Sequence, residues 1–314
     1  MSGPVGTLAS DLATLGRRLG RSAHKDHPLG ALTTYRVGGP AALYVEPDGE
    51  DALLEVARSL AGVDVPVLVV GRGSNLLVAD RGFDGLVVRL GTSFETLAIQ
   101  GTEVRAGAAL SLPVLARRTA AAGLHGLEWA VGVPGSVGGA IRMNAGGHGS
   151  DTAATLIRYR WVDMLGASVH EAPADRLGFG YRHTTVRSTD VVVAGHHRLA
   201  PGDPDEGAAA IDEIVRWRRS NQPGGSNAGS VFTNPSGDSS GRLIDACGLK
   251  GFRLGSAEVS PKHANFIQAD QGGSADDVHR LIEHVARTVE AATGVVLSTE
   301  VRLVGFPRSG SDDR

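Results

Sequence analysis

A short glycine-rich segment is the first place where the residue types could do chemistry. It consists of Gly71, Arg72, Gly73, Ser74 and Asn75, directly after an apolar run. Its glycines let a ligand approach the backbone closely, and consecutive amide N–H groups can form a concave anion site. A β-turn stabilised by the asparagine explains the same residues equally well. The segment is not a P-loop, because no Gly-Lys-Ser/Thr follows, and Leu76 breaks the G-x-G-x-x-G spacing of a dinucleotide fingerprint.

A second glycine-rich segment spans residues 132–149 and reads GVPGSVGGAIRMNAGGHG. Its glycine density suits a backbone that packs against a large flat or charged ligand. A flexible surface loop is the alternative, but the interleaved Val133, Val137 and Ile141 favour burial and therefore a ligand-binding segment. The two segments could hold two parts of one extended dinucleotide, in a site that is neither a Walker nor a Rossmann site.

Three polar residues further along the chain could act on such a ligand. Arg182 could clamp a carboxylate bidentately, although most arginines are surface residues. Ser230 lacks the G-x-S-x-G surroundings of a hydrolase nucleophile, so a structural role is the simpler interpretation. Glu300 lies in an apolar strand and needs a polar partner if it points inward. The eleven histidines contain no H-E-x-x-H pattern and Cys247 is the single cysteine, so we expect no metal site and no internal disulfide.

Composition bounds the kind of protein to which these residues belong. A length of 314 residues favours two or three domains, and 41% hydrophobic with 21% charged residues excludes wholesale disorder. A net charge of −3 gives no electrostatic footprint of a nucleic-acid-binding protein. The N-terminus lacks the apolar stretch of a signal peptide, and the longest apolar run, residues 65–70, is too short to cross a bilayer. We therefore expect a soluble cytoplasmic protein.

Hydrophobic periodicity predicts the elements of the first part of the chain. Leucines at helical spacing predict a short peripheral helix within residues 1–24. A β-α-β unit follows, with a strand from Ala41 and a helix over 49–60. The β-branched run 65–70, which closes this unit, is typical of a strand buried on both faces.

The rest of the chain is predicted to be strand-rich in the middle and helical toward its end. Strand-like runs alternate with glycine turns around one helix, 112–122. After a linker-like stretch, 200–207, helices are predicted over 208–220 and 275–292. Ser274 is the expected N-cap of the last helix, because an acidic residue stands three positions after it.

In their order along the chain, these segments resemble the UDP-N-acetylenolpyruvoylglucosamine reductase (MurB) family. The resemblance covers nearly everything from residue 28 to residue 306, and the ordered set is far more specific than any one of its members. The matching segments are TTYRVGG (33–39), VVGRGSNLLVAD (69–80), GLEWAVGVPGSVGGAIRMNAGGHG (126–149), FGYRHT (179–184), NAGSVFTNP (227–235), SGRLIDACGLKG (240–251), SPKHANF (260–266) and STEVRLVG (298–305).

The resemblance implies an α+β fold. In that fold a two-subdomain FAD-binding part of the PCMH/vanillyl-alcohol-oxidase type is joined to a smaller α/β substrate-binding domain, which closes over the substrate. The implied parts are an N-terminal extension (1–24), FAD-binding subdomain 1 (25–90, with a C-terminal strand, 295–308), FAD-binding subdomain 2 (91–200) and the substrate-binding domain (201–294).

The resemblance also implies an FAD cofactor held by both glycine-rich segments. No His or Cys lies between Pro66 and Asp80, where related flavoproteins can attach the cofactor covalently, so non-covalent FAD is expected. The family's FAD positions fall on Gly71, Arg72, Gly73, Ser74, Asn75, Pro134, Gly135, Ser136, Gly138, Gly139, Asn144 and Gly146.

The implied reaction is the NADPH-dependent reduction of UDP-N-acetylglucosamine enolpyruvate to UDP-N-acetylmuramate, a step of peptidoglycan precursor synthesis. The family's catalytic positions fall on Arg182, Ser230 and Glu300. The arginine would stabilise negative charge that develops beside the substrate carboxylate, and the glutamate would share this role in a protonated form or through a bridging donor. The serine would protonate the adjacent carbon. Substrate-binding positions match more weakly and fall on Tyr181, Asn234, Lys250 and His263.

The chain departs from the family pattern at one position and resembles one of its subtypes. Asn221 stands where many members have lysine, so a phosphate contact is missing or is supplied by Arg218 or Arg219. The short stretch between Arg182 and Ser230 resembles the shorter subtype, which lacks a loop with a capping tyrosine. We expect a monomer that acts on a small-molecule nucleotide sugar, with neither nucleic acid nor membrane as a partner.

Two other functions stay open on the sequence alone. A flavin oxidase of the same superfamily that acts on an alcohol would keep the glycine-rich segments. Such an oxidase is not expected to contain both NAGSVF (227–232) and STEVR (298–302). A nucleotide-sensing or scaffold protein that kept the fold and lost turnover is the non-enzymatic alternative. All three catalytic positions are filled, which argues against that loss.

Overall fold

The computed structural model describes residues 7–307, which divide into two compact units. The first unit contains residues 7–25, Leu43–Arg72 and Gly85–Arg218, and the second contains Asp26–Ala42, Gly73–Asp84 and residues 219–307. The chain passes from the first unit to the second inside the first glycine-rich segment, after Arg72. Residues 1–6 of the expected N-terminal extension lie outside the described residues. Every helix between residues 7 and 307 is too short or too polar to span a bilayer.

Helices and antiparallel strands are mixed along the described chain, which gives an α+β protein. The helices are α1 (Leu8–Leu19), α2 (Glu50–Ser59), α3 (Leu112–Ala121), α4 (Val137–Met143), α5 (Pro204–Asn221), α6 (Ser240–Ala246) and α7 (Ala275–Thr293). The strands are β1 (Ala23–Pro28), β2 (Pro40–Val45), β3 (Val67–Val69), β4 (Leu76–Val78), β5 (Phe83–Val88), β6 (Leu97–Gln100), β7 (Glu103–Gly107), β8 (Leu124–His125), β9 (Gly146–Gly147), β10 (Ser150–Asp151), β11 (Leu156–Asp163), β12 (Ser168–Pro173), β13 (Asp190–Arg198), β14 (Ala200–Pro201), β15 (Arg253–Leu254), β16 (Ala257–Val259), β17 (Ile267–Ala269) and β18 (Arg302–Val304).

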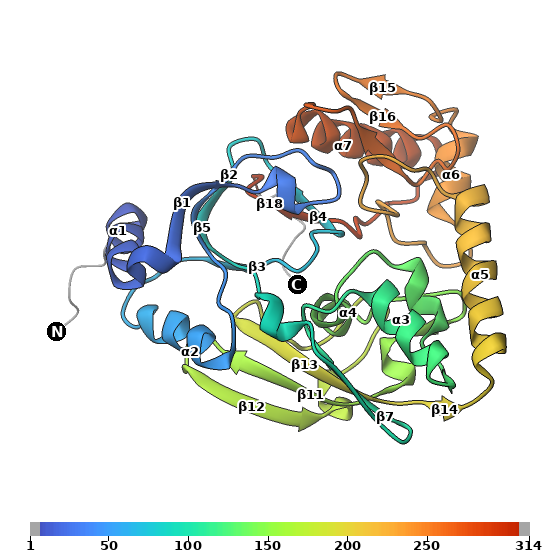
Figure 1. Cartoon of the computed structure of the whole chain (residues 1–314). Coiled ribbons are helices and arrows are strands. Elements are labelled where there is room, and N and C mark those ends of the chain that lie inside the picture. Colours follow the sequence, from blue (N-terminus) through green and yellow to red (C-terminus); the bar gives the residue numbers. More distant parts are fainter. Residues whose placement is uncertain (1–6, 308–314) are drawn as a thin grey trace. The chain divides into compact units, whose positions relative to one another are not determined.

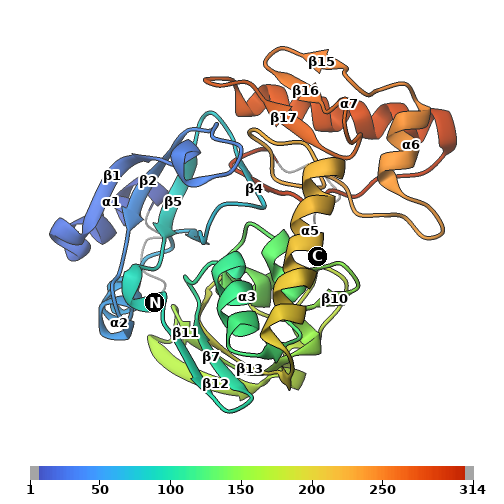
Figure 2. The same ribbon diagram turned by 45° about the vertical axis from the view of Figure 1, so that its right-hand side comes forward.

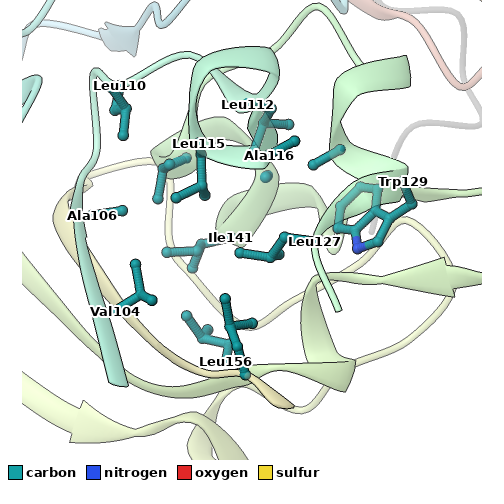
Figure 3. Packing of buried hydrophobic residues seen from close by; sticks show 14 of the residues in the cluster. Val104, Ala106, Leu110, Leu112, Leu115, Ala116, Leu127, Trp129, Ile141 and Leu156 are labelled. Atoms are coloured by element: carbon teal, nitrogen blue, oxygen red, sulfur yellow. The ribbon is translucent and has the colours of Figure 1, made fainter. Parts of the chain in front are cut away.

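A five-stranded antiparallel sheet forms the centre of the first unit, with strand order β12-β11-β13-β7-β6. Helices α3 and α4 cover one of its faces (Figure 1). Leu115 of α3 and Ile141 of α4 point into the same apolar cluster as Leu156 of β11 (Figure 3). Helix α5 runs beside α3, where Gly207 packs against Ala120 (Figure 2). The second glycine-rich segment is therefore backed by a packed core.

The opposite face of this sheet contributes to a second apolar cluster. Successive side chains of β13 point to opposite faces of the sheet, so Val192 belongs to the first apolar cluster while Val191 and Val193 belong to the second. The second cluster also contains residues of α1, α2, β2 and β5. The neighbouring sheet has the order β1-β2-β5-β3, in which β5 is central and β3 is a half-buried edge strand. The prediction that the run 65–70 is buried on both faces is therefore wrong. Strand β5, which the sequence did not single out, takes the buried position.

Helix α7 organises the second unit and packs against the antiparallel sheet β15-β16-β17. Its predicted N-cap is confirmed, because the Ser274 Oγ accepts a hydrogen bond from the Asp277 N–H at 3.1 Å. Gly294 ends the helix with a left-handed φ of +73°. The apolar face of α7 shares a cluster with Leu77 of β4. Strand β4 pairs in parallel with β18, so the strand after the first glycine-rich segment is joined to the strand after Glu300.

Two helices differ from the sequence predictions. Helix α5 begins at Pro204, so half of the expected linker is helical, because proline and acidic residues suit a first helical turn. Helix α4 lies inside the second glycine-rich segment, for which the sequence predicts no helix. Glycine is unfavourable in a helix, but a β-carbon at Gly138 would lie only 3.0 Å from the Ala108 Cβ. Close packing on the chain after β7 therefore explains a glycine there.

A buried histidine makes the first unit sensitive to acid. His197 of β13 is 3% exposed, and its Nδ1 lies 3.0 Å from the Thr155 hydroxyl. Its Nε2 has no hydrogen-bond partner within residues 7–307. Burial lowers the pKa of His197 to about 4 from its ordinary 6.5, with a smaller contribution from the charge of His196. The ring is therefore neutral in the folded protein at neutral pH.

We predict that His197 destabilises the protein as the pH falls from 6.5 to 4. In this window the unfolded chain binds a proton at this position and the folded chain does not. The stability that neutral His197 contributes is therefore fully present above pH 6.5, the pKa of histidine in the unfolded chain. As the pH falls to 4, the free energy of unfolding decreases by up to about 3 kcal/mol. His197→Asn cannot titrate, so denaturant titrations across this pH range should show a smaller acid loss in the variant. Equal losses in the two proteins would contradict the prediction.

Candidate functional site

The first glycine-rich segment has no room for side chains at its glycines. Gly73 has a left-handed φ of +58°, and a β-carbon built on it would overlap the carbonyl oxygen of Leu32. The Thr34 N–H donates to the Gly73 carbonyl at 3.2 Å and fixes the turn from that side. At Gly71 a β-carbon would lie 2.5 Å from the Ser136 Oγ. The backbone around Gly73 therefore requires a glycine, whereas at Gly71 only the Ser136 side chain stands in the way.

The same contact at Gly71 joins the two glycine-rich segments within the first unit. Ser136 is 3% exposed and is the N-cap of α4, where its Oγ accepts a hydrogen bond from the Gly139 N–H at 3.4 Å. Two of the residues that the resemblance assigns to FAD, far apart in sequence, thus meet. The other assigned residues of this segment lie on α4, just before it, or on the turn and hairpin that follow it.

Arg182 lies in a tight turn beside the end of the second segment. Gly180 and His183 exchange backbone hydrogen bonds of 3.0 and 3.3 Å across this turn. Arg182 has a left-handed φ of +55°, a conformation that costs a non-glycine residue about 1 kcal/mol. Its Nη2 donates to the Gly146 carbonyl at 3.0 Å, and its Cζ lies 5.0 Å from the ring centre of Tyr181, which is 64% exposed. The guanidinium is thus held against a segment assigned to FAD.

In the second unit Ser230 lies directly beside the Glu300 strand. The Glu300 N–H donates to the Val231 carbonyl at 2.8 Å, and Phe232 forms a β-bridge with Thr299. The half-buried Ser230 hydroxyl makes no hydrogen bond to any atom of residues 7–307. Its proton is therefore not committed to a protein acceptor within the described chain.

Asn75 connects the first glycine-rich segment to Glu300. Its Nδ2 donates to the Glu300 carbonyl at 3.0 Å, and its own carbonyl accepts from the Arg302 N–H at 3.0 Å. These bonds continue the pairing of β4 with β18. The second unit thus brings together Asn75, Ser230 and Glu300, while the first unit brings together Gly71, Ser136, Gly146 and Arg182. The chain itself links the two groups through residues 71–75.

The weaker substrate positions gather around the start of α6. The Asn234 Oδ1 accepts from the Ser240 N–H at 3.1 Å, and a β-carbon on Gly241 would lie 3.3 Å from the His263 ring. Burial lowers the pKa of His263, and the charge of Lys250 lowers it further. The Lys250 ammonium itself forms an ion pair with the exposed Asp245 carboxylate, at 2.7 Å. Three of the four predicted substrate residues are therefore neighbours in the second unit, and Tyr181 belongs to the first.

Asn265 supports the site, although the sequence did not single it out. It is 4% exposed, and its side chain exchanges hydrogen bonds of 3.0 and 2.8 Å with the backbone of Phe232. Its carbonyl accepts from the Val231 N–H at 2.9 Å. Asn265 thereby fixes the backbone that follows Ser230. The sequence does contain a hint, because Asn265 stands between the apolar Ala264 and Phe266. An amide side chain buried among such neighbours needs hydrogen-bond partners.

The first glycine-rich segment fits a phosphate-bearing cofactor. None of the five amide N–H groups of residues 71–75 donates a hydrogen bond to an atom of residues 7–307. The Thr34 Oγ1 beside it is buried and has no partner in the same part of the chain. Buried polar atoms and clustered amides normally find acceptors, and the oxygens of a pyrophosphate are such acceptors. The residues present therefore suit the diphosphate of FAD.

Comparison with known proteins shows the family to which the chain belongs. A family model described as "FAD binding domain" matches residues 41–171, and one described as "UDP-N-acetylenolpyruvoylglucosamine reductase, C-terminal domain" matches residues 221–304. The UDP-N-acetylenolpyruvoylglucosamine reductase of Rubrobacter xylanophilus is 42% identical over 295 residues, which cover 93% of this chain and 98% of that protein. A relative of the same name from Azorhizobium caulinodans is 38% identical over 304 residues, or 96% and 97% of the two chains.

A solved structure agrees with these relatives. The crystal structure of UDP-N-acetylenolpyruvylglucosamine reductase (MurB) from Thermus caldophilus superimposes with a TM-score of 0.78 at 35% identity. The match covers 89% of this chain and 98% of that one.

Fold and site together define an FAD-dependent oxidoreductase in which an FAD-binding domain is joined to a smaller C-terminal domain. The predicted fold class and the predicted FAD cofactor are thus confirmed. The chain belongs to the UDP-N-acetylenolpyruvoylglucosamine reductase family.

Proposed function

We propose that this protein uses NADPH and non-covalently bound FAD to reduce UDP-N-acetylglucosamine enolpyruvate to UDP-N-acetylmuramate, for peptidoglycan precursor synthesis. Family membership over nearly the whole chain supports this reaction. The observation that carries the proposal is a chain of backbone contacts: the Asn75 side chain donates to the Glu300 carbonyl, and the Glu300 N–H donates to the carbonyl of Val231, which follows Ser230. These contacts support a proton donor and a carboxyl group next to the β4–β18 pair, which follows the segment proposed to bind the cofactor.

Three side chains have proposed roles in the chemistry. Bound FAD supplies the hydride carrier between NADPH and the enolpyruvyl double bond. Arg182 stabilises the negative charge that develops on the substrate carboxylate, and one preorganised contact of this kind contributes about 3 kcal/mol to transition-state stabilisation. Glu300 orients the same group, and the Ser230 hydroxyl gives its proton to the carbon that bears the carboxylate. Because Ser230 is only half-buried, water can return a proton to its oxygen.

The remaining assignments rest on the family resemblance together with the local geometry. Cofactor contacts are proposed from Gly71, Arg72, Gly73, Ser74, Asn75, Pro134, Gly135, Ser136, Gly138, Gly139, Asn144 and Gly146. Substrate contacts are proposed from Tyr181, Asn234, Lys250 and His263. The proposed parts are the extension 1–24, the FAD-binding subdomains 25–90 (with 295–308) and 91–200, and the substrate-binding domain 201–294. We propose a cytoplasmic monomer whose substrate is a free nucleotide sugar.

The colour of the purified protein tests the proposal. The preparation is expected to be yellow, to bleach when NADPH is added without oxygen, and to regain its colour when UDP-N-acetylglucosamine enolpyruvate follows. Nuclear magnetic resonance of the product should show a lactyl ether. A colourless protein that binds no added FAD would contradict the proposal. So would a reduced flavin that is not re-oxidised when this substrate is added. Rapid re-oxidation by air with an alcohol as the electron donor would point to a flavin oxidase instead.

A further inference from the structure

The side chain of Asn144 connects three backbone segments of the first unit. Asn144 ends α4 in a left-handed conformation, with φ +42°, and is 4% exposed. Its Nδ2 donates to the Asp151 Oδ2 at 3.0 Å and to the Gly180 carbonyl at 3.1 Å, while its Oδ1 accepts from the Ala153 N–H at 3.1 Å. Both amide hydrogens and the amide oxygen are therefore used on protein atoms.

These contacts fix the orientation of the Asn144 amide. One end of the amide faces two acceptors, and the other faces a backbone donor, so only one assignment of nitrogen and oxygen satisfies all partners. Asp151 is fixed in turn, because its Oδ1 accepts from the Ala154 N–H at 3.2 Å and its backbone pairs with Gly146 in the β9–β10 hairpin. Asp151 thus supplies the carboxylate that sets the direction of the amide.

The Gly180 carbonyl belongs to the turn that carries Arg182. The same turn is tied to the second glycine-rich segment at two further points, because Arg182 donates to the Gly146 carbonyl and the Thr184 hydroxyl donates to the Arg142 carbonyl at 2.8 Å. Arg182 has a left-handed backbone in this turn. Since that conformation is unfavourable for arginine, surrounding contacts must maintain it.

We propose that Asp151 is a positioning residue for Arg182: it orients the amide of Asn144, and Asn144 holds the Arg182 turn through the Gly180 carbonyl. The inference deepens the proposed function and rests on the role assigned there to Arg182. It also gives Asn144 a task that requires no direct contact between its side chain and the cofactor. Asp151 therefore acts on the half-reaction that needs Arg182 and not on cofactor binding.

The variant Asp151→Asn tests this chain of contacts with little change in shape. The new amide has one acceptor oxygen where the carboxylate has two, so it cannot accept from both the Asn144 amide and the Ala154 N–H. Either the bond to Asn144 is lost, or the side chain at 151 loses the bond that fixes it and no longer holds the Asn144 amide in place. We expect an unchanged flavin content, an unchanged rate of flavin reduction by NADPH, and flavin re-oxidation by the enolpyruvyl substrate that is about tenfold slower at saturation. The dissociation constant of the substrate should change far less than this limiting rate.

A double-mutant cycle separates positioning from a general structural effect. In an Arg182→Ala background, Asp151→Asn should cause no further slowing of re-oxidation, because the side chain on which it acts is already gone. The inference would be overturned if Asp151→Asn slowed re-oxidation by the same factor in wild-type enzyme and in the Arg182→Ala variant. A loss of bound flavin that parallels the loss of rate would also overturn it.

Asp163→Asn is a matched control for the loss of a carboxylate. Like Asp151, Asp163 accepts a backbone N–H, here from Leu165 at 3.0 Å, and contacts one side-chain donor, here Arg187 at 3.0 Å. The Asp163→Asn variant should leave the rates of both half-reactions unchanged. If wild-type enzyme fails to react with the enolpyruvyl substrate, the proposed function is wrong. If wild type reacts and Asp151→Asn re-oxidises at the wild-type rate, the inference about Asp151 is wrong.

Discussion

Replacing Ser230 with alanine is expected to leave the reduction of flavin by NADPH unchanged and to slow re-oxidation by the enolpyruvyl substrate by about 10²–10⁴-fold. The first half-reaction delivers a hydride and needs no proton donor at this position. The second must place a proton on carbon, and the Ser230 hydroxyl is an uncommitted donor on the backbone segment joined to Glu300. Stopped-flow absorbance of the flavin measures the two rates separately.

The exposed Ser236 of the same unit provides the control for this experiment. Ser236→Ala removes the same hydroxyl from a loop position and should leave both rates unchanged. The Ser230 variant should fold normally, because no hydrogen bond within the described residues depends on its hydroxyl. Equal slowing of both half-reactions in Ser230→Ala would show that the serine positions the cofactor and does not donate the proton.

Gly73→Ala is expected to yield a folded protein that purifies with little or no flavin. The new methyl group would overlap the Leu32 carbonyl oxygen, so the backbone must move, and with it the amide groups that are proposed to bind the diphosphate. Losing one or two charge-assisted hydrogen bonds of about 1.5–3 kcal/mol each would weaken FAD binding by about tenfold at least. Titration of the apoprotein with FAD, followed by flavin fluorescence, measures the change.

Gly101→Ala separates the effect of the backbone angle from the effect of the overlap. Gly101 has the same φ of +58° but lies in the β6–β7 hairpin, with no atom within 4 Å of an added β-carbon. We expect this control to cost about 1 kcal/mol of stability and to bind FAD normally. If Gly73→Ala binds FAD as tightly as Gly101→Ala does, the glycine is not required for the cofactor.

Gly71 offers a second and more specific comparison. Its added β-carbon would meet only the Ser136 side chain, at 2.5 Å from the Oγ and 3.6 Å from the Cβ. Ser136→Ala removes the nearer atom. The double variant Gly71→Ala/Ser136→Ala should therefore bind FAD as well as Ser136→Ala alone, whereas no side-chain substitution can restore Gly73→Ala.

Local sequence signals predicted the elements with the strongest periodicity and the clearest ends. The last helix is one of these, because its apolar face repeats at helical spacing between Ser274 and Gly294. The strands of the five-stranded sheet were also visible as separate runs. The short helix α4 was not, because Gly138 and Gly139 lower helix propensity and the reason for Gly138 is its contact with Ala108, far away in sequence.

The candidate site shows the same division between local and long-range information. The motif order indicated which residues belong together, and each unit brings its share of them into contact. The partners of these residues could not be predicted, since the bonds of Asn75 to Glu300 and of Asn144 to Gly180 depend on the completed fold. Sequence alone suggested a cofactor contact for Asn144, whereas the structure occupies every polar atom of its side chain with protein partners.

The parallel pairing of β4 with β18 has a consequence for the order of events during synthesis on the ribosome. Leu76 lies opposite Arg302, so the second half of the first glycine-rich segment gains its neighbouring strand only when the chain has been synthesised through β18, more than two hundred residues later. Loop closure over so many residues is entropically costly, and growing chains fold their early parts first. A nascent chain that stops before β18 lacks the strand that supports residues 73–75, and the first glycine-rich segment is therefore among the last parts of the molecule to reach its final structure.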